Sequence, residues 1–377
     1  MDGREDGQER EQQNGQEEQM STTLEDYRTL GRTGLRVSPF GLGAMTFGAE
    51  ADDATASDIF HRYLNAGGNF VDTADLYAGG DSERCLGKLI RTSKARDSVV
   101  ISTKFSFSMQ RGNPNGGGNG RAHIMRAVEA SLARLDTDYI DLYILHAWDR
   151  TTPVEEVIVT LNDLVRSGKV RHIGMSDVPA WYASRAQTLA ETLRYEPLAV
   201  LQLEYSLCSR SLEREHVPLA AETGISIVPW SPLASGFLTG KYQRNDGQLS
   251  GLGRVSTARG SGNPTLEKFG VDDRSWNILA ALKTASEQIG ATPTEVALAW
   301  VLRRPQVTSV LVGATTTAQL ETNLAALSID LPEAQYNELT AVSRPVSNEL
   351  DIFFEPVMQA MVHGGATVRR GVTHAAQ

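Results

Sequence analysis

Residues 140–145 read IDLYIL, a nearly continuous apolar run that is typical of a parallel strand buried on both faces. Seven further β-branched or aliphatic runs recur along the chain, and a longer helical pattern follows each of them. The eight runs are 37–42, 69–72, 98–104, 140–146, 171–176, 198–203, 225–230 and 309–313. This alternation of buried strands and helices predicts an α/β fold with a parallel sheet.

The segments between these runs have the periodicity of amphipathic helices. Residues 57–66 follow two aspartates that can cap a helix, and they stop before a pair of glycines. Residues 122–135 place four aliphatic side chains on one face, and residues 153–167 open with a proline and stop before a glycine. Eight strand–helix units match a (β/α)8 TIM barrel. Periodicity alone also allows a doubly wound open sheet, but the lack of a GxGxxG motif favours the closed barrel.

The composition indicates an ordinary core and a strongly acidic start. The chain has 377 residues, of which 41% are hydrophobic, and its formal net charge is −10. Residues 1–20 carry seven acidic and two basic side chains, and such a segment has too little apolar surface to fold. We therefore expect a disordered acidic tail at 1–22, one barrel domain at 27–345 and a C-terminal tail at 346–377.

Several classes of function find no support in the composition. The negative net charge argues against binding of nucleic acid, and no apolar run is long enough to span a membrane. Two cysteines, Cys85 and Cys208, are too few for a disulfide framework, and they predict a reducing, cytoplasmic location. The seven histidines lack the paired spacing of a metal site, so no metal is expected. The oligomeric state is not readable from the sequence.

Polar side chains lie where the predicted strands end. Asp72, Lys104 and His146 end the second, third and fourth runs, and Tyr77 follows the second. Because the carboxyl ends of barrel strands meet at one face, we expect these four groups around one space. Taken singly, the lysine can reach solvent, the histidine can be satisfied in the core and the aspartate can cap a turn. Together they suit proton donation to a carbonyl oxygen, since a nearby cation lowers the pKa of a phenol.

Seven collinear segments resemble the aldo-keto reductase superfamily. They are GGNFVDTADLYAGGDSE at 67–83, STK at 102–104, DLYILHAWD at 141–149, GKVRHIGMSD at 168–177, LQLEYS at 201–206, PWSPLASGFLTGKY at 229–242 and VGATTTAQLETN at 312–323. The layout is most similar to the aryl-alcohol-dehydrogenase-like branch. The resemblance implies a TIM barrel that binds NADPH in an extended form across the end where the strands terminate.

The resemblance also implies a role for each matching residue. Tyr77 is expected to be the general acid–base, Asp72 and Lys104 to lower its pKa, and His146 to orient the substrate carbonyl. Contacts with the nicotinamide are implied for Ser176, Asp177, Gln202 and Trp230. Contacts with the pyrophosphate are implied for Ser231, Leu233, Gly236, Leu238, Gly240 and Lys241. A phosphate-binding turn and contacts with adenine are implied for Gly313, Ala314, Thr315, Thr316, Gln319 and Asn323.

Two positions depart from the pattern of the superfamily. Asp177 takes the place of a common asparagine, and an ionised aspartate cannot donate a hydrogen bond to the carboxamide carbonyl. Thr315 stands where many relatives carry an arginine for the 2′-phosphate, and Lys241 and Arg254 are candidates to replace that arginine. The expected cofactor is therefore NADPH/NADP+, with NADH left open.

The expected substrate is a small carbonyl compound, an aldehyde or a ketone that is reduced reversibly to the alcohol. The glycine-rich loop 105–121 follows Lys104 and either shapes the substrate pocket or is a flexible surface loop. Trp148 and Phe47 lie in loops at strand ends and suggest an aromatic lining. Two alternatives stay open: a keto-sugar reductase of a biosynthetic pathway, and a cofactor-binding regulatory subunit with little turnover, since some relatives are channel β-subunits.

Overall fold

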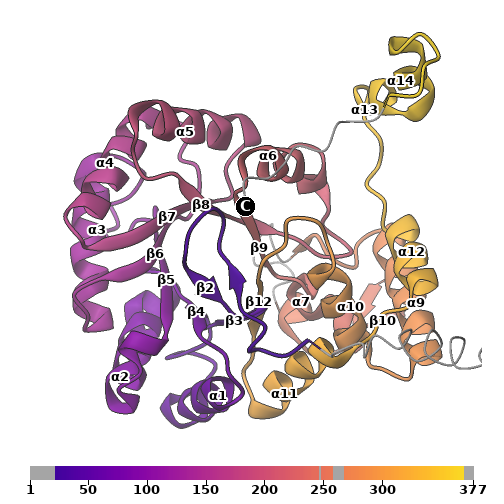
Figure 1. Ribbon diagram of the computed structural model, residues 1–377. Helices are drawn as coiled ribbons and strands as arrows, with labels where there is room; N and C mark the ends of the chain where they lie inside the picture. Colours follow the sequence, from indigo (N-terminus) through magenta and orange to yellow (C-terminus); the bar gives the residue numbers. More distant parts are fainter. Residues whose placement is uncertain (1–21, 246–247, 258–266, 369–377) are drawn as a thin grey trace, which may run out of the picture. The chain divides into compact units, whose positions relative to one another are not determined.

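The computed structural model describes residues 22–245, 248–257 and 267–368. Eight parallel strands form a ring, and helices lie around its outside (Figure 1). The strands are β3 (Phe40–Gly43), β4 (Phe70–Asp72), β5 (Val100–Phe105), β6 (Ile140–Leu145), β7 (Val170–Ser176), β8 (Leu198–Glu204), β9 (Ser226–Trp230) and β12 (Val310–Gly313). They pair in this order, with β12 beside β3, so the predicted (β/α)8 TIM barrel is confirmed.

The ring is closed by backbone hydrogen bonds between β9 and the residues just before β12. The Ile227 amide donates to the Gln306 carbonyl at 2.9 Å, and the Thr308 amide donates to the Ile227 carbonyl at 3.0 Å. These bonds exclude the open, doubly wound sheet that the sequence pattern also allowed.

Helices follow the strands as the alternating pattern predicts. They are α1 (Asp53–Asn65), α2 (Asp81–Ser93), α3 (Arg121–Leu135), α4 (Val154–Arg166), α5 (Ala180–Leu193) and α6 (His216–Thr223), with the 3-10 turns η1 (Tyr77–Gly80), η2 (Arg96–Ser98) and η3 (Ser211–Glu213) between them. The three helices predicted at 57–66, 122–135 and 153–167 correspond to α1, α3 and α4. Helix α1 begins earlier than predicted because the Asp52 side chain accepts a hydrogen bond from the Thr55 amide at 2.8 Å.

A longer excursion separates β9 from β12. It contains η4 (Ala234–Thr239), the hairpin of β10 (Gln243–Asn245) and β11 (Gln248–Ser250), α7 (Arg254–Thr257), α9 (Asp273–Ile289) and α10 (Pro293–Leu302). After β12 come α11 (Thr317–Ala325), η5 (Ala326–Ser328) and α12 (Glu333–Val342). The start of this excursion leaves the barrel at the end where the strands terminate, beside the candidate site.

A short hairpin of β1 (Arg28–Thr29) and β2 (Arg36–Val37) covers the opposite end of the barrel. The amide of Gly31 donates to the Ser226 hydroxyl at the start of β9, at 2.6 Å. Residues 37–42 are therefore not the single strand predicted from the sequence, and the hairpin was not predicted. Pro39 explains the difference, because it has no backbone N–H and interrupts the ladder between Val37 and Phe40.

The apolar core has two parts. The larger part lies between the strands and the surrounding helices. The smaller part fills the barrel interior and comprises Leu30, Val37, Phe70, Val100, Leu142, Ile144, Ala199, Val200, Val228 and Leu311. Two of these side chains, Leu30 and Val37, come from the hairpin, and Trp230 packs against the same cluster at the other end. The barrel interior is thus filled by apolar side chains from the strands and from the hairpin.

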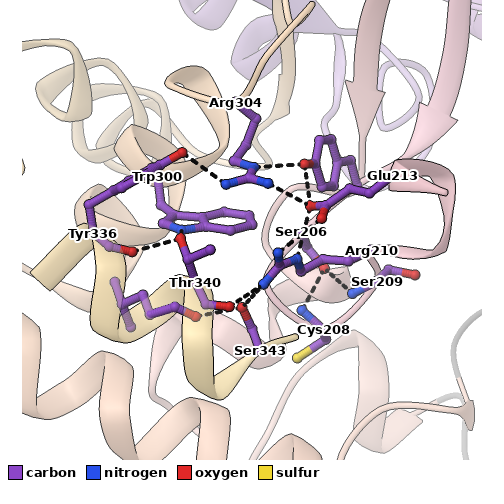
Figure 2. A network of polar contacts seen from close by, with 12 residues as sticks. Ser206, Cys208, Ser209, Arg210, Glu213, Trp300, Arg304, Tyr336, Thr340 and Ser343 are labelled. Atoms are coloured by element: carbon purple, nitrogen blue, oxygen red, sulfur yellow. Dashed lines mark hydrogen bonds and ion pairs between the residues drawn. The ribbon is translucent and has the colours of Figure 1, made fainter. Parts of the chain in front are cut away.

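A buried polar network joins the connection after β8 to α10 and α12 (Figure 2). Glu213 accepts hydrogen bonds from Tyr205 at 2.5 Å, from Arg210 at 2.9 Å and from Arg304 at 3.1 Å. Arg210 also donates to the carbonyl of Thr340 at 2.6 Å. The network therefore ties the connection after β8 to α12 and to the segment between α10 and β12, close in sequence to the residues that close the barrel.

The ends of the chain differ from the middle. The predicted acidic tail, 1–22, lies outside the described residues except for Thr22. Arg344 begins a second unit, which holds two short helices, α13 (Asp351–Phe354) and α14 (Pro356–Val362), in the region expected as a C-terminal tail. Within the described ranges, no helix has both the length and the apolar character needed to cross a membrane.

Candidate active site

The four predicted catalytic residues come together at the C-terminal ends of three neighbouring strands. Asp72 is the last residue of β4, Lys104 lies near the end of β5, and His146 follows β6 directly. Tyr77 begins η1, the turn after β4. Because β4, β5 and β6 pair in parallel, the backbone alone places these side chains at one end of the barrel, which we call the mouth.

A buried ion pair forms the centre of the site. The Lys104 ammonium donates to Asp72 Oδ2 at 2.5 Å and to the Thr73 carbonyl at 2.7 Å. Asp72 Oδ1 accepts from the Ser102 hydroxyl and from the Gln202 amide, each at 2.9 Å. Burial alone would lower the pKa of Lys104, but the charges of Asp72 and Tyr77 outweigh it and raise that pKa, so the ammonium stays charged.

The Tyr77 phenol lies beside this ion pair. Lys104 Nζ is 4.9 Å from the centre of the Tyr77 ring. Burial raises the pKa of the phenol, Lys104 lowers it and Asp72 raises it, and the net result is a pKa above its ordinary value. This corrects the expectation of a lowered pKa: Lys104 lowers the pKa as expected, but burial and the charge of Asp72 both raise it, and together they outweigh Lys104. Tyr77 therefore holds its proton at neutral pH.

The His146 ring completes the group. Its centroid is 5.7 Å from that of Tyr77 in an edge-to-face arrangement, and Phe107 meets it in the same way at 5.0 Å. Burial and the nearby positive charge of Lys104 place the pKa of His146 well below its ordinary value, so the imidazole is neutral. Nδ1 of His146 is buried and has no hydrogen-bond partner in the described part of the chain.

The residues expected around a nicotinamide lie on the far side of the mouth. Ser176 ends β7 and is buried, whereas Asp177 follows it, is exposed and has a left-handed backbone with φ of 48°. The Trp230 indole donates to Asp177 Oδ1 at 3.2 Å. Protein atoms that crowd the carboxylate raise the pKa of Asp177 to about 6, even though solvent reaches it. Gln202 is buried, and its amide nitrogen donates to Asp72. The amide oxygen of Gln202 does not take part in this bond.

The loop after β9 has the backbone of an anion-binding site. Ser231, Ala234, Ser235 and Gly236 all have positive φ, a pattern that turns successive N–H groups to one side. The Ser231 hydroxyl accepts from the Ser235 amide at 2.9 Å and so fixes the turn. Among the expected pyrophosphate residues here, Leu238 is buried, whereas Leu233, Gly236 and Gly240 are partly exposed.

Two cations lie close to this loop. Burial and the positive charge of Arg254 both lower the pKa of Lys241. Lys241 forms no ion pair with any residue in the described ranges, while Arg254 lies 3.6 Å from Glu50. Positive-φ amides and an unpaired ammonium fit a pyrophosphate, so the donor set at the mouth is compatible with a dinucleotide.

The turn after β12 brings the remaining candidates to the mouth. Thr316 caps α11 by accepting from the Gln319 amide, and Gln319 Oε1 accepts from the Thr315 amide at 2.8 Å. Asn323 is buried and donates to the carbonyl of Gly313 at 3.1 Å, so this side chain supports the turn. Gly313 is exposed and Ala314 is buried. The backbone of the turn and the exposed Gln319 are thus the groups available to a ligand.

Aromatic residues lie near the four predicted catalytic residues, which we call the tetrad, but they are not all the aromatic residues predicted from the sequence. Phe47 is fully buried in the core, so the expectation that it lines a pocket is wrong. Trp148 is half-buried and meets Trp181 edge-to-face, with ring centroids 5.6 Å apart. Trp181 is 56% exposed and was missed by the sequence reading, although it follows the Ser176–Asp177 segment closely. The loop 105–121 contributes Phe107, which contacts His146.

Within the described ranges, no three His, Cys, Asp or Glu side chains gather in a way that could hold a metal ion. The groups gathered at the mouth that can take part in proton transfer are the Lys104–Asp72 ion pair, the Tyr77 phenol and the His146 imidazole. The match to known proteins adds the family: the sequence profile named Aldo/keto reductase family matches residues 39–344. The chain belongs to the aldo/keto reductase family. As a member, it is an oxidoreductase, and the resemblance stated from its motifs is confirmed.

The alignments with curated relatives extend over most of this aldo/keto reductase. Norsolorinic acid reductase of Aspergillus flavus is 34% identical over 84% of this chain and 81% of its own length. An aryl-alcohol dehydrogenase of Pestalotiopsis microspora is 32% identical over 81% of this chain and 78% of its own length. A probable voltage-gated potassium channel subunit beta of Oryza sativa subsp. japonica is 36% identical over 80% of this chain and 91% of its own length. The relatives thus include both enzymes and a channel subunit.

Proposed function

We propose that this oxidoreductase reduces an aldehyde or ketone, with NADPH as hydride donor and Tyr77 as general acid. The observation that carries the proposal is the buried Lys104–Asp72 pair at 2.5 Å, beside the ring of Tyr77. A buried ion pair is seldom more stabilising than apolar side chains of the same size. A role in the chemistry explains it better, because a fixed cation stabilises negative charge that develops on a nearby oxygen.

When bound, the reduced nicotinamide supplies a hydride to the carbonyl carbon. Tyr77 donates its proton to the carbonyl oxygen as negative charge grows there, and its raised pKa keeps that proton available at neutral pH. Lys104 offsets the charge left on the phenol oxygen. A neutral imidazole has one N–H, so His146 can donate a hydrogen bond that positions the carbonyl.

The mouth supports an extended dinucleotide in the arrangement that the motifs imply. We assign Ser176, Gln202 and Trp230, which lie in the last part of β7, β8 and β9, to the nicotinamide, and the amides of the loop after β9, with Lys241, to the pyrophosphate. Thr315 carries no charge, so Lys241 and Arg254 are the cations that we assign to the 2′-phosphate. A preference for NADPH over NADH rests on these two side chains.

The lining of the mouth favours an aromatic substrate. Phe107 on the loop after β5 meets His146, Trp148 lies on the loop after β6, and Trp181 at the start of α5 meets Trp148. All three side chains are at least partly accessible. Flat aromatic rings gain from edge-to-face and stacked contacts with such side chains. The relatives named norsolorinic acid reductase and aryl-alcohol dehydrogenase agree with this assignment.

A second candidate is a regulatory subunit that binds the cofactor with little turnover. The relative named as a potassium channel subunit beta favours it, because it is 36% identical to this chain. The two candidates share the cofactor and differ in catalysis, so turnover separates them.

The proposal is tested by titrating the protein with NADPH and then adding 4-nitrobenzaldehyde. We expect saturable binding in calorimetry, quenching of tryptophan fluorescence and oxidation of NADPH on addition of the aldehyde. Trp230→Phe should lose most of the quenching, whereas Trp276→Phe, a half-buried residue of α9, should keep it. Absence of binding would overturn the proposal, and binding without turnover of any carbonyl compound would favour the regulatory subunit.

A further inference from the structure

Asp177 places a carboxylate at the mouth with no cation to neutralise it. The Trp230 indole donates to one oxygen at 3.2 Å, and the Ser176 hydroxyl donates to the other at 3.3 Å. Both donors are neutral. No lysine, arginine or histidine forms an ion pair with Asp177 in the part of the chain that the structure describes. An asparagine could accept the same bond from Trp230, so the negative charge is what the aspartate adds.

The charged groups that face Asp177 are already paired with one another. Lys104 on β5 is bound by Asp72, and Glu204 at the end of β8 is bound by Lys268. Tyr77 and His146 are neutral at neutral pH because of their shifted pKa values. Within each of these two ion pairs the opposite charges nearly cancel, so neither pair adds much net charge to the mouth. Asp177 therefore leaves this part of the mouth with about one net negative charge, close to Trp230.

A nicotinamide ring is neutral when reduced and carries one positive charge when oxidised. Hydride transfer breaks a C–H bond of the ring and takes both bonding electrons to the carbonyl carbon, where a new C–H bond forms. The ring is oxidised and becomes cationic, the carbonyl is reduced, and Tyr77 supplies the proton to the oxygen. A fixed negative charge beside the ring lowers the free energy of the cationic form and leaves the neutral form almost unchanged.

We propose that the Asp177 carboxylate makes this protein bind the oxidised cofactor more tightly than the reduced one, and that it stabilises the positive charge that develops during carbonyl reduction. This inference rests on the proposed function, because it assumes that the nicotinamide binds beside Trp230. Asp177 is then more than a substitute for an amide ligand, since it sets the balance between the two oxidation states of the cofactor.

The test is the ratio of the dissociation constants of NADP+ and NADPH, measured by calorimetry for the wild type and for Asp177→Asn. At pH 8 the variant should raise the ratio of the NADP+ constant to the NADPH constant on the order of tenfold, the scale of one charge at a few ångströms in a partly screened site. Asp97→Asn, an exposed residue of η2 before β5, is the matched control and should leave the ratio unchanged.

The wild type provides a second, independent measurement. Protonation removes the charge of Asp177, whose pKa is raised to about 6, so the ratio should rise as the pH falls from 8 to 5. The 2′-phosphate titrates in the same range, but it is present in both forms of the cofactor and cancels in the ratio. In Asp177→Asn the ratio should not depend on pH.

The outcomes separate this inference from the function on which it rests. If neither form of the cofactor binds, the proposed function fails. If both forms bind and the ratio is the same in wild type and variant, or is independent of pH in the wild type, the role of Asp177 is refuted while the cofactor assignment stands. The pH series uses only the wild type and so decides the matter even if the variant does not fold.

Discussion

At the scale of single residues, proton transfer depends on the hydroxyl group of Tyr77 and on the ammonium of Lys104, which is fully buried. The ammonium is held by two oxygens, one from Asp72 and one from the backbone of Thr73. Its position is therefore fixed before any substrate arrives. Pre-arranged charge of this kind needs little reorganisation when the reaction occurs.

Removal of the phenol hydroxyl by Tyr77→Phe should reduce kcat by a factor of roughly 10² to 10⁴, the usual scale for loss of a general acid. Lys104→Met keeps the phenol but removes the cation that lowers its pKa, so it should also slow reduction. Because both changes disable one proton transfer, the losses should not multiply in the double variant. Single-turnover rates for the four proteins, with melting temperatures as a check on folding, measure this. Strictly multiplicative losses would point to another proton donor, with His146 as the next candidate.

The tetrad could be predicted from the sequence because each member lies at or just after a strand end. Asp72, Lys104 and His146 end apolar runs, and parallel strands in a barrel terminate on the same side. The net pKa of Tyr77 could not be predicted, since it depends on how deeply the phenol is buried. The burial of Phe47 was also hidden, because a loop residue close to a strand end can point into the core or toward the mouth with the same sequence pattern.

At the scale of elements, the turn η1 positions Tyr77 through an unusual backbone. Ala78, Gly79 and Gly80 follow Tyr77 with φ values of 50°, 65° and 94°. This left-handed path turns the chain from β4 into α2 within a few residues. A methyl group at Gly80 would lie 2.8 Å from Cδ of Arg134, whose guanidinium is bound to Glu83 at 2.5 Å.

Gly80→Ala should therefore disturb both the turn and the Arg134–Glu83 pair. Gly79→Ala is the matched control, because its φ is also positive but no atom lies within 4 Å of the added methyl. The left-handed backbone should cost each variant about 1 kcal/mol in the free energy of unfolding. The clash should cost Gly80→Ala a further ~1 to 3 kcal/mol and lower its turnover. Urea denaturation and steady-state kinetics test this, and equal effects of the two substitutions would show that the clash is relieved without consequence.

The strands and the three expected helices could be predicted because their apolar periodicity is strong. The β1–β2 hairpin could not, because its two-residue strands are too short to show any periodicity. Two residues of this hairpin, Leu30 and Val37, nevertheless fill the barrel interior. Their role depends on contacts with residues far away in the sequence, such as Ala199, which a local pattern does not record.

At the scale of the whole molecule, closure of the barrel depends on the seam between β9 and β12. Few backbone hydrogen bonds cross this seam in the described residues, and the network around Glu213 joins the elements on either side of it (Figure 2). Arg210 and Glu213 come from the connection after β8, and Arg304 follows α10. The side-chain exposures of Arg210, Glu213 and Arg304 are 4%, 18% and 12%, so solvent screens these charges little.

Replacement of one charged residue of the network around Glu213 should therefore lower the free energy of unfolding. Glu213→Gln removes the carboxylate from between two arginines and should lower the free energy of unfolding by about 3 kcal/mol at pH 7, as expected when a buried ion pair loses one partner. The matched control is Glu321→Gln on α11, whose ion pair with Arg62 is exposed and should contribute almost nothing. Chemical denaturation at pH 7 compares the two variants with the wild type, and equal stabilities would contradict a structural role for the network.

The effect of Glu213 should also depend on pH in a defined direction. Burial alone would raise the pKa of Glu213, but hydrogen bonds from Arg210 and Tyr205 outweigh burial and lower that pKa below its ordinary value. A carboxylate with a lowered pKa in the folded state stabilises the protein above its unfolded pKa, and this contribution is lost as the pH falls through the folded pKa. The difference between wild type and Glu213→Gln should thus be constant from pH 8 to about 5 and should shrink at lower pH. A difference that grows in acid would show that Glu213 is protonated more readily in the folded state than in the unfolded chain, and that the two arginines do not hold its charge.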